Sequence, residues 1–467
     1  MSTLLQRKTH NLLAELEPVL NEFIQAAAES KGDFHAVERA GDNVFRKART
    51  LIMSAGLTVS SQCADHDFRC PDCAAPLHIW ERRERTVQTC EGEAHYRAVR
   101  SRCPRCLTFH APLEQANGLA NSQFTTMAQA LVGSYAAQMP YAPAAAALAE
   151  RGMNISAKEV DRMARDVAAW RKGEQDAVVS AAFGQTDPER SDEACTLPPL
   201  FDWSDWRGVS AMLASVDGAH VRSPERGPDG LEWFEARGAI LSAVGREARG
   251  KRVYLGGVFS ADALFANLSA AWQQSPHKNL PLVFAADGAT WIWDRVRMFF
   301  PNCIEVLDIY HAGEHLASAA AALWGEGSEQ YKQWKRSARD RLLAPGGVRA
   351  VLHTLLHGLR SGRPYDAAAL RTEFAYLWRH RRRMRYHWLQ QRGLPIGSGA
   401  MESAIKQTVT ARLRGAGMKW TRDGADAILT LRAAHQSGEI PSTALRQHRQ
   451  RMQVISRYRP AVSQRAA

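Results

Sequence analysis

The chain has 467 residues, of which 45% are hydrophobic and 23% are charged. This length predicts two to four domains, and the composition is typical of a globular protein. The apolar run Ala142–Ala149 is short and contains Pro143, so we expect no membrane span. The N-terminal Arg7 and Lys8 precede no uninterrupted apolar segment, so we expect no signal peptide and a cytoplasmic location.

Positive charge is concentrated in the last quarter of the chain. The formal net charge is +12 at pH 7, and residues 351–467 carry 21 Lys or Arg against 6 Asp or Glu. The remaining residues hold 39 basic and 42 acidic side chains. This distribution predicts a nucleic-acid-binding face in the last quarter, and a solvated basic surface is the alternative.

Two cysteine pairs follow an N-terminal helical region at 1–58. Residues 63–115 contain Cys70-Pro-Asp-Cys73 and Cys103-Pro-Arg-Cys106, separated by 29 residues. Two such pairs can complete a tetrahedral Cys₄ site, so we expect a zinc-ribbon-like module with a structural Zn²⁺. Paired disulfides are the alternative, and the expected cytoplasmic location disfavours them.

Residues 120–170 have a helical pattern. A break at Gly152-Met-Asn154 precedes Ser156, and Glu159 lies three residues further on in a capping-box arrangement. A helix, a break and a capped helix fit a possible helix-turn-helix DNA-binding domain, and they also fit an ordinary helical bundle. Residues 171–210 are polar and contain prolines, so they are predicted to form a linker.

Strand patterns begin at residue 211. The first three predicted strands are Ala211–Val216, Phe234–Val244 and Arg252–Phe259. They are followed by a helix at Ala263–Gln273, a strand at Leu282–Ala286, a helix at Trp291–Phe300 and a strand at Cys303–Leu307. This order over residues 211–311 predicts a mixed α/β sheet. Residues 312–395 return to a helical pattern, residues 396–438 contain a further helix, and residues 439–467 are expected to form a basic, loosely ordered tail.

Three aspartates each follow an apolar run that predicts a buried strand. Asp217 and Asp287 both precede Gly-Ala, and Asp308 follows the next strand with His311 three residues later. An Asp-Gly pair also marks a simple turn, and Asp308 also suits a helix N-cap. Carboxylates at neighbouring strand ends can converge, and carboxylate oxygens suit Mg²⁺ or Mn²⁺. The sequence therefore favours a divalent metal site.

A fourth acidic residue, Glu402, lies near the start of a helix that follows Gly397-Ser-Gly399. A carboxylate at this position also complements the helix dipole, and Lys406 at i+4 also suits an ion pair with it. Basic and aromatic residues around Glu402 and in the run Arg379–Arg385 are candidate DNA contacts: Arg381, Arg382, Arg383, Lys406, Arg412, Arg414, Lys419 and Trp420. The sequence has no Gly-x₄-Gly-Lys-Ser/Thr motif, so we expect no ATP.

The acidic motifs together resemble those of DDE transposases of bacterial insertion sequences, in particular the ISKra-type family of the Mutator-like group. The matching elements are Val216-Asp-Gly218, Ala286-Asp-Gly288, Leu307-Asp-Ile-Tyr-His311 and Gly397-Ser-Gly-Ala-Met-Glu-Ser403. The resemblance implies an α/β RNase H-like catalytic core with a helical insertion. It implies that Asp217, Asp287 and Glu402 are the catalytic triad that binds two Mg²⁺ (or Mn²⁺) ions, and that Asp308 and His311 are an auxiliary element.

This resemblance also implies a reaction and its partners. Two ions held by the triad activate water for attack at the phosphodiester of a transposon end, and the freed 3′-hydroxyl then attacks a target strand. The implied partners are double-stranded DNA, at the terminal inverted repeats and at the target, and further copies of the chain in a homodimer or larger assembly. The implied location is the bacterial nucleoid, with no membrane partner.

Two other functions remain open at the level of sequence. One is a DNA-binding regulator with a decayed or repurposed transposase core. The intact acidic set argues against decay, because simple DNA binding needs no negative charge in a basic groove. The other is a structure-selective nuclease without strand transfer, which would share the same core.

Overall fold

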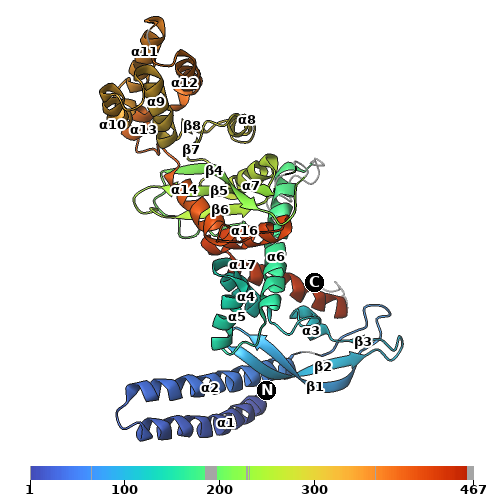
Figure 1. Cartoon of the computed structure of the whole chain (residues 1–467). Coiled ribbons are helices and arrows are strands. Elements are labelled where there is room, and N and C mark those ends of the chain that lie inside the picture. Colours follow the sequence, from blue (N-terminus) through green and yellow to red (C-terminus); the bar gives the residue numbers. More distant parts are fainter. Residues whose placement is uncertain are drawn as a thin grey trace. The chain divides into compact units, whose positions relative to one another are not determined.

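The computed structural model describes residues 2–64, 66–184, 197–227, 230, 232–362 and 364–459. The chain forms two compact units, one of Met1–Trp170 with Ile440–Ala467 and the other of Arg171–Glu439; Figure 1 labels their elements. In the described part of the chain, no helix has the length and apolar character that a membrane span requires.

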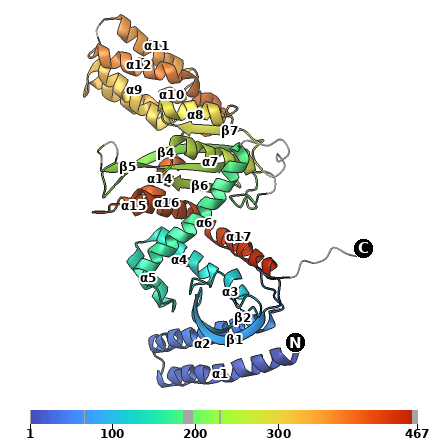
Figure 2. The ribbon, with the colours of Figure 1, turned by 90° about the vertical axis from the view of Figure 1, so that its right-hand side faces the viewer.

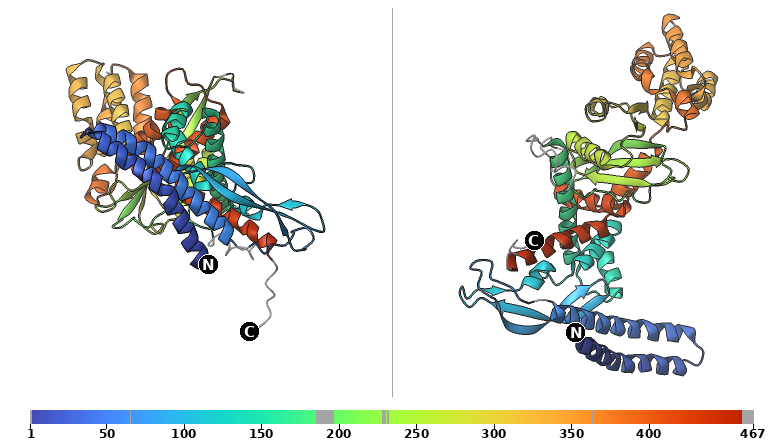
Figure 3. Two further views of the ribbon diagram at one scale, coloured as in Figure 1. Left: turned by 90° about the horizontal axis from the view of Figure 1, so that it is seen from below. Right: turned by 180° about the vertical axis from the view of Figure 1, so that it is seen from behind.

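The first unit begins with two long helices, α1 (Ser2–Glu29) and α2 (Phe34–Cys63). They run antiparallel as a hairpin, seen at the blue end of the chain in Figure 3. The Asp33 carboxylate accepts hydrogen bonds from the N–H groups of His35 (3.0 Å) and Ala36 (3.2 Å). This N-cap explains why α2 begins where it does, because the first N–H groups of a helix have no partner within the helix.

A curved antiparallel sheet follows, with β1 (His78–Thr89) paired to β2 (Gly92–Arg102) and β2 paired to the short β3 (Phe109–His110). Figure 2 shows the curvature of β1 and β2. The two-residue turn between them leads into Gly92, whose φ of +102° requires glycine. The two Cys-x-x-Cys pairs precede β1 and follow β2, so the β1–β2 pairing brings them together.

Four helices continue the chain: α3 (Pro112–Ala116), α4 (Thr126–Gln138), α5 (Tyr141–Glu150) and α6 (Ala157–Phe183). The predicted capping box is present at α6. The Ser156 hydroxyl accepts from the Glu159 N–H (3.2 Å), and the Glu159 carboxylate accepts from the Ser156 N–H (3.2 Å). Each residue therefore satisfies a backbone donor of the other.

The structure contradicts the expected linker at 171–210 in two places, where the chain is a helix or is buried in a core. Helix α6 extends to Phe183, because Val178 continues an apolar face that is buried in the core of the second unit. Four further residues of the segment are also buried in that core: Leu200, Phe201, Trp203 and Trp206. The middle of the expected linker, 185–196, lies outside the described residues.

The expected loosely ordered tail is also wrong for residues 440–459, which form α17 (Ile440–Met452) and η5 (Gln453–Tyr458). Tyr458 is buried against Phe68 and His110. Its hydroxyl donates to Gln115 Oε1 (2.7 Å), and its carbonyl accepts from the Arg69 N–H (2.6 Å). Tertiary packing of this aromatic ring outweighs the basic composition, and the rest of the tail, 460–467, lies outside the described residues.

The second unit is built on a five-stranded mixed sheet with the order β6-β5-β4-β7-β8. Its strands are β4 (Ala211–Arg222), β5 (Trp233–Val244), β6 (Arg252–Gly257), β7 (Leu282–Ala286) and β8 (Ile304–Leu307). Strands β4, β5 and β6 are antiparallel neighbours, whereas β4, β7 and β8 run parallel. The mixed α/β fold class predicted from the sequence is therefore confirmed.

Helices cover both faces of this sheet. Helices α7 (Ala261–Gln274) and α8 (Thr290–Phe299) pack with Met212, Ala214 and Val216 of β4 in one apolar core. Helices α14 (Gly399–Ile405) and α16 (Arg422–Gln436) pack on the other face, where Gly238 and Gly256 lie. Between α14 and α16 lie the π-helical turn η4 (Lys406–Thr410) and α15 (Ala411–Leu413).

A helical segment separates β8 from α14. It contains α9 (Ile309–Trp324), α10 (Glu329–Leu343), α11 (Gly347–Arg360), α12 (Ala367–His380), η3 (Arg381–Arg383) and α13 (Tyr386–Gln391). Figure 2 shows the first four of these helices side by side. Their apolar faces share a core with Leu213, Val283 and Leu307 of the sheet, so the segment is anchored to the parallel half of the sheet.

Candidate active site and metal centre

The four cysteines of the two Cys-x-x-Cys pairs converge in the first unit. The sulfur atoms of Cys70, Cys73, Cys103 and Cys106 all lie within 4.8 Å of one another. Four sulfurs about 2.3 Å from a tetrahedral ion would lie about 3.8 Å apart. The cluster therefore has the donor type and the size to hold a structural metal such as zinc, which supports the predicted Cys₄ site.

The two cysteine turns have the same backbone form. Ala74 and Leu107 each follow the second cysteine of a pair and adopt positive φ angles of 58° and 61°. The Ala74 N–H bonds to the Cys70 carbonyl (2.9 Å), and the Leu107 N–H bonds to the Cys103 carbonyl (3.0 Å). Because left-handed conformations are costly for residues other than glycine, both turns are held against a local backbone preference.

Hydrogen bonds in these turns favour the thiolates of Cys103 and Cys70, the form that binds metals, whereas a hydrogen bond to Cys73, burial and the other cysteines raise the pKa of Cys106. The backbone N–H of Cys106 donates to Cys103 Sγ (3.3 Å) and is the main cause that lowers the pKa of Cys103 to about 7. Burial alone would raise the pKa of Cys70, but hydrogen bonds from the backbone of Asp72 and Cys73 lower it. His110 Nε2 lies 3.6 Å from Cys70 Sγ, and Cys70, Asp72 and His110 also lie close enough together to hold a metal ion.

The acidic residues of the second unit come from three separate parts of the chain. Asp217 lies within β4, Asp287 directly follows β7, and Glu402 lies on α14. The predicted strand end before Asp217 is wrong, because β4 continues to Arg222. Strands β4 and β7 are parallel neighbours with Ala214 opposite Phe284, and the same register places Asp217 level with Asp287. Helix α14 packs on β4 and β5 and brings Glu402 to the same region of the sheet.

A glycine on β5 explains why α14 can pack on this face of the sheet beside Asp217. Gly238 pairs directly with Asp217 across β4 and β5. Directly paired residues share one face of a sheet. A Cβ atom on Gly238 would lie 3.3 Å from Ile405 and 3.4 Å from Met401, both on α14. The missing side chain therefore leaves room for the helix that carries Glu402.

Nearby carboxylates contribute to a raised pKa of Asp217. Burial raises the pKa of Asp217, a hydrogen bond from the Gly218 N–H (2.7 Å) opposes this, and the charges of Asp287, Glu235 and Glu402 raise it further, to about 6. Like charges disfavour ionisation only when they are near one another. The three predicted residues are therefore brought into one electrostatic neighbourhood, although they are far apart in the sequence.

The three carboxylates are not packed as tightly as the cysteines. In the part of the chain that the structure describes, their oxygens do not form a group that lies within 4.8 Å throughout. Glu402 Oε1 accepts from Lys406 Nζ (2.7 Å), and both side chains are exposed. The i+4 ion pair expected as the alternative for Glu402 is thus present.

Asp287 is held by its own turn. Its Oδ1 accepts from the Ala289 N–H (2.8 Å), and its carbonyl accepts from Trp293 Nε1 (2.8 Å). Gly288 has no room for a side chain, because a Cβ would lie 1.8 Å from the Tyr376 hydroxyl. That hydroxyl is buried without a hydrogen-bond partner among the described residues. Burial is the main cause that raises the pKa of Tyr376, and the charge of Asp287 is the second.

Asp308 is the N-cap of α9, which is the alternative role that the sequence predicted for this residue. Its Oδ1 accepts from the N–H groups of Tyr310 (2.7 Å) and His311 (3.0 Å). His311 lies on the first turn of α9, with Nδ1 3.5 Å from Glu314 and its ring 4.9 Å from that of His315. His315 in turn bonds Glu373 (2.7 Å), so His311 belongs to a polar cluster between α9 and α12.

Two of the candidate DNA contacts have structural partners instead. Arg383 donates to Glu305 (2.6 Å) and stacks over Trp293 at 4.1 Å from the ring centroid. Arg412 is buried, with its guanidinium 5.1 Å from the Trp420 centroid. Neither side chain is presented to a phosphate, because burial and ion pairing occupy the charge. The prediction of phosphate contact therefore does not fit these two residues.

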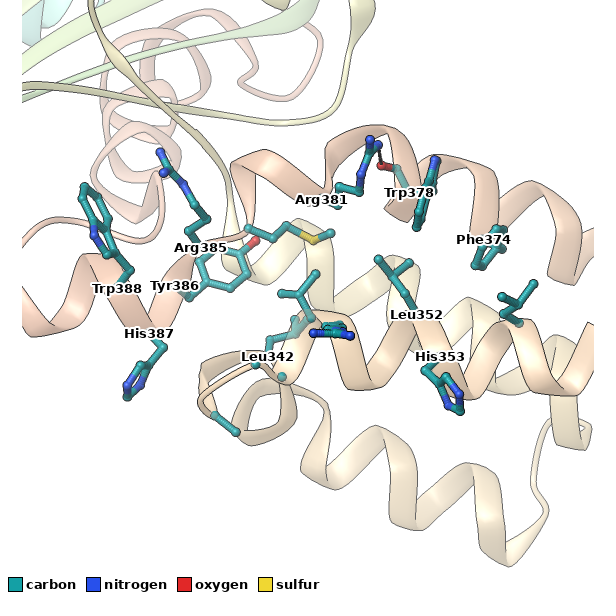
Figure 4. A pocket seen from close by; sticks show the side chains of 17 residues that line it. Leu342, Leu352, His353, Phe374, Trp378, Arg381, Arg385, Tyr386, His387 and Trp388 are labelled. Carbon is teal, nitrogen blue, oxygen red and sulfur yellow. Dashed lines mark hydrogen bonds between the residues drawn. The ribbon is translucent and has the colours of Figure 1, made fainter.

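The other basic candidates are more accessible. Arg382 and Arg414 are exposed, and Lys419 is exposed 4.0 Å from Glu232. Arg381 lines a cavity of about 620 Å³ between α11, α12 and α13, where its Nη1 donates to the Trp378 carbonyl (2.7 Å; Figure 4). The exposed residues could contact a polyanion, whereas Arg381 is partly engaged at the rim of an apolar cavity.

Sequence reasoning missed three residues of this region. Gly238 interrupts an apolar strand, which often indicates a close approach of another backbone or helix, and this signal was available. Glu235 raises the pKa of Asp217 from β5, and Tyr376 reaches Gly288 from α12. Neither contact has a local sequence signal, because both depend on the packing of distant elements.

Comparison with known proteins adds no family assignment. No protein-family model matches the chain, and no significant match is found among curated proteins.

Proposed function

We propose that this chain is a DDE transposase, which cuts DNA at the ends of an insertion sequence and joins those ends to a target. The observation that carries the proposal is the convergence of Asp217, Asp287 and Glu402 on one region of the sheet, through the parallel pairing of β4 with β7 and the packing of α14 on β4. A protein with net charge +12 gains nothing in simple DNA binding by gathering carboxylates at one place. A site for divalent cations accounts for this arrangement.

The arrangement of the sheet supports the same proposal. Three antiparallel strands followed by two parallel ones, in the order β6-β5-β4-β7-β8, are compatible with the RNase H-like core that the resemblance implies. Asp217 lies on the central strand β4, Asp287 directly follows its parallel neighbour β7, and the helix of Glu402 packs on β4 and β5. The helical segment between β8 and α14 is compatible with the implied insertion.

A site for two divalent ions does not require the carboxylates to form one tight group. Such ions lie about 4 Å apart, and Mg²⁺ lies about 2.1 Å from its oxygens, so donors at opposite ends can be about 8 Å apart. A spread beyond 4.8 Å is therefore compatible with two Mg²⁺ or Mn²⁺ ions. Bound ions would polarise the phosphodiester and activate the attacking oxygen.

The protein's own residues supply binding and orientation. Asp217, Asp287 and Glu402 would hold the ions, and Glu402 must then leave Lys406. An exposed ion pair contributes only about 0.5 kcal/mol, so this release is easy. Arg382, Arg414 and Lys419 would contact backbone phosphates of double-stranded DNA. Because two transposon ends must be joined to one target, we propose that the active form is a homodimer or larger assembly.

The experiment uses the full chain and DNA carrying its candidate inverted repeats. We expect nicked and strand-joined products with Mg²⁺, and a loss of at least about 10²-fold in rate for Asp217→Asn, Asp287→Asn and Glu402→Gln. Glu329→Gln is a matched control, because Glu329 is an exposed helical carboxylate bonded to Lys332 (2.8 Å). DNA binding without cleavage by the unmodified protein would instead support a regulator.

A further inference from the structure

Asp308 lies at the junction of β8 and α9, and its two carboxylate oxygens accept hydrogen bonds from two different segments. Its Oδ1 caps α9, and its Oδ2 accepts from the N–H (2.5 Å) and the hydroxyl (2.8 Å) of Ser398. The residue is buried. A carboxylate has about four acceptor positions, and Asp308 uses four. The charge of this side chain is therefore satisfied within the protein.

Ser398 opens the turn that leads to Glu402. The Ser398 carbonyl accepts from the N–H groups of Met401 (2.5 Å) and Glu402 (3.3 Å). Just before it, a Cβ on Gly397 would lie 3.0 Å from Asp308 Oδ2, so the glycine lets the chain pass close to the carboxylate. The start of α14 is thus fastened to a residue 90 positions earlier in the chain.

The backbone of Asp308 bonds to the end of β7, next to Asp287. Its N–H donates to the carbonyl of Ala286 (2.8 Å), the residue directly before Asp287. A second backbone bond, from the Ile309 N–H to the Ile396 carbonyl (3.2 Å), reinforces the connection. One residue therefore links the end of β7, which presents Asp287, to the beginning of the helix that presents Glu402.

We propose that Asp308 is a positioning residue that sets the separation of Asp287 and Glu402 through Ser398. The inference rests on the proposed function, since it assigns a task within that acidic site. Asp308 acts through its neighbours and contacts neither ion nor DNA, because its acceptor positions are occupied. Charge-assisted hydrogen bonds of a buried carboxylate are strong enough to hold one geometry, and a site for two ions requires such a geometry.

Asp308→Ser separates this task from helix capping. Serine is also a good N-cap, but its side chain is too short to reach Ser398 as well. We expect cleavage at saturating Mg²⁺ to fall about 10²-fold, as misplacement of a reacting group by about 1 Å can cause, and the half-saturating Mg²⁺ concentration to rise about tenfold. Ser398→Ala removes only the hydroxyl bond and should shift both quantities in the same direction by about fivefold.

Ser328→Ala is the matched control, because the Ser328 hydroxyl caps α10 by accepting from the Tyr331 N–H (3.1 Å). It should lower the melting temperature without changing the Mg²⁺ dependence. The Mg²⁺-induced rise in melting temperature is measured in parallel without DNA, and it should shrink in Asp308→Ser and Ser398→Ala.

The outcomes distinguish the two proposals. If the unmodified protein never cleaves end DNA, the proposed function fails, and the melting measurement alone decides the role of Asp308. If the unmodified protein cleaves and both variants keep its Mg²⁺ dependence, the positioning role is overturned. The same holds if they behave like Ser328→Ala, with lower stability and unchanged Mg²⁺ dependence.

Discussion

Replacing Asp217 by asparagine should make the metal-free protein more stable at neutral pH. The pKa of Asp217 is raised from its ordinary value of 3.8 to about 6, chiefly by burial and further by the charges of Asp287, Glu235 and Glu402. The folded state therefore binds this proton more tightly than the unfolded state. Stability from this group is fully present below pH 3.8 and is lost as the pH rises to about 6.

The size of the effect follows from the difference in pKa. About two pKa units at 1.36 kcal/mol each give about 3 kcal/mol as an upper limit. Asp217 is half-buried, and solvent screening lowers the figure, so we expect a gain of about 1–2 kcal/mol for Asp217→Asn at pH 7.5. The gain should shrink as the pH falls from 7.5 toward 4.5, because the carboxylate then becomes protonated in the folded protein.

The assay is urea unfolding followed by hydrogen exchange of the β4 and β5 amides, which reports on the unit that contains the site. Mg²⁺ at ten times its dissociation constant should stabilise the unmodified protein by about 1.4 kcal/mol and should stabilise Asp217→Asn much less. Glu329→Gln should behave like the unmodified protein. A gain for Asp217→Asn that is independent of pH, or equal stabilisation of both proteins by Mg²⁺, would refute the reasoning.

Three further predictions test other parts of the chain. Metal analysis should find about one zinc per chain, lost in Cys70→Ser and retained in Cys63→Ser; a stable, metal-free native protein would contradict this. Gly238→Val should displace α14 and lower Mg²⁺-dependent cleavage at least about 10²-fold, while Gly313→Ala, in open space on α9, should not; equal rates would exclude the glycine argument. Leu107→Gly should raise the free energy of unfolding by up to about 1 kcal/mol, because glycine tolerates the positive φ; chemical denaturation checks the sign.

The strands of the sheet could be predicted from the sequence because the patterns that indicate them are local. Each predicted strand between residues 211 and 307 is a short apolar run bounded by turn residues, and each overlaps an observed strand. The capping box of Ser156 and Glu159 and the Cys-x-x-Cys pairs were predictable for the same reason. In each case the residues that define the feature lie within a few positions of one another.

The errors arise where distant segments decide the outcome. Polar composition at 171–210 masked four buried aromatic and aliphatic residues that pack on the sheet. Residues 440–459 of the basic tail are ordered because Tyr458 is buried beside the cysteine cluster. Arg383 and Arg412 counted as surface charges in the sequence, but Glu305 and Trp420 engage them. Spacing does not identify these partners. Glu305 lies 78 residues before Arg383, and Trp420, although near Arg412 in the sequence, lies in a loop whose packing has no local signal.

The same contrast explains how the acidic site is assembled. Asp217 and Asp287 come together through the parallel pairing of β4 and β7, which a strand pattern can anticipate. Glu402 requires two non-local conditions: Gly238 must leave room for α14, and Asp308 must hold the turn at Ser398. Neither Gly238 nor Asp308 is one of the three carboxylates, yet both contact the segment that carries Glu402. A search for acidic residues alone would therefore miss the glycine and the buried aspartate on which their convergence depends.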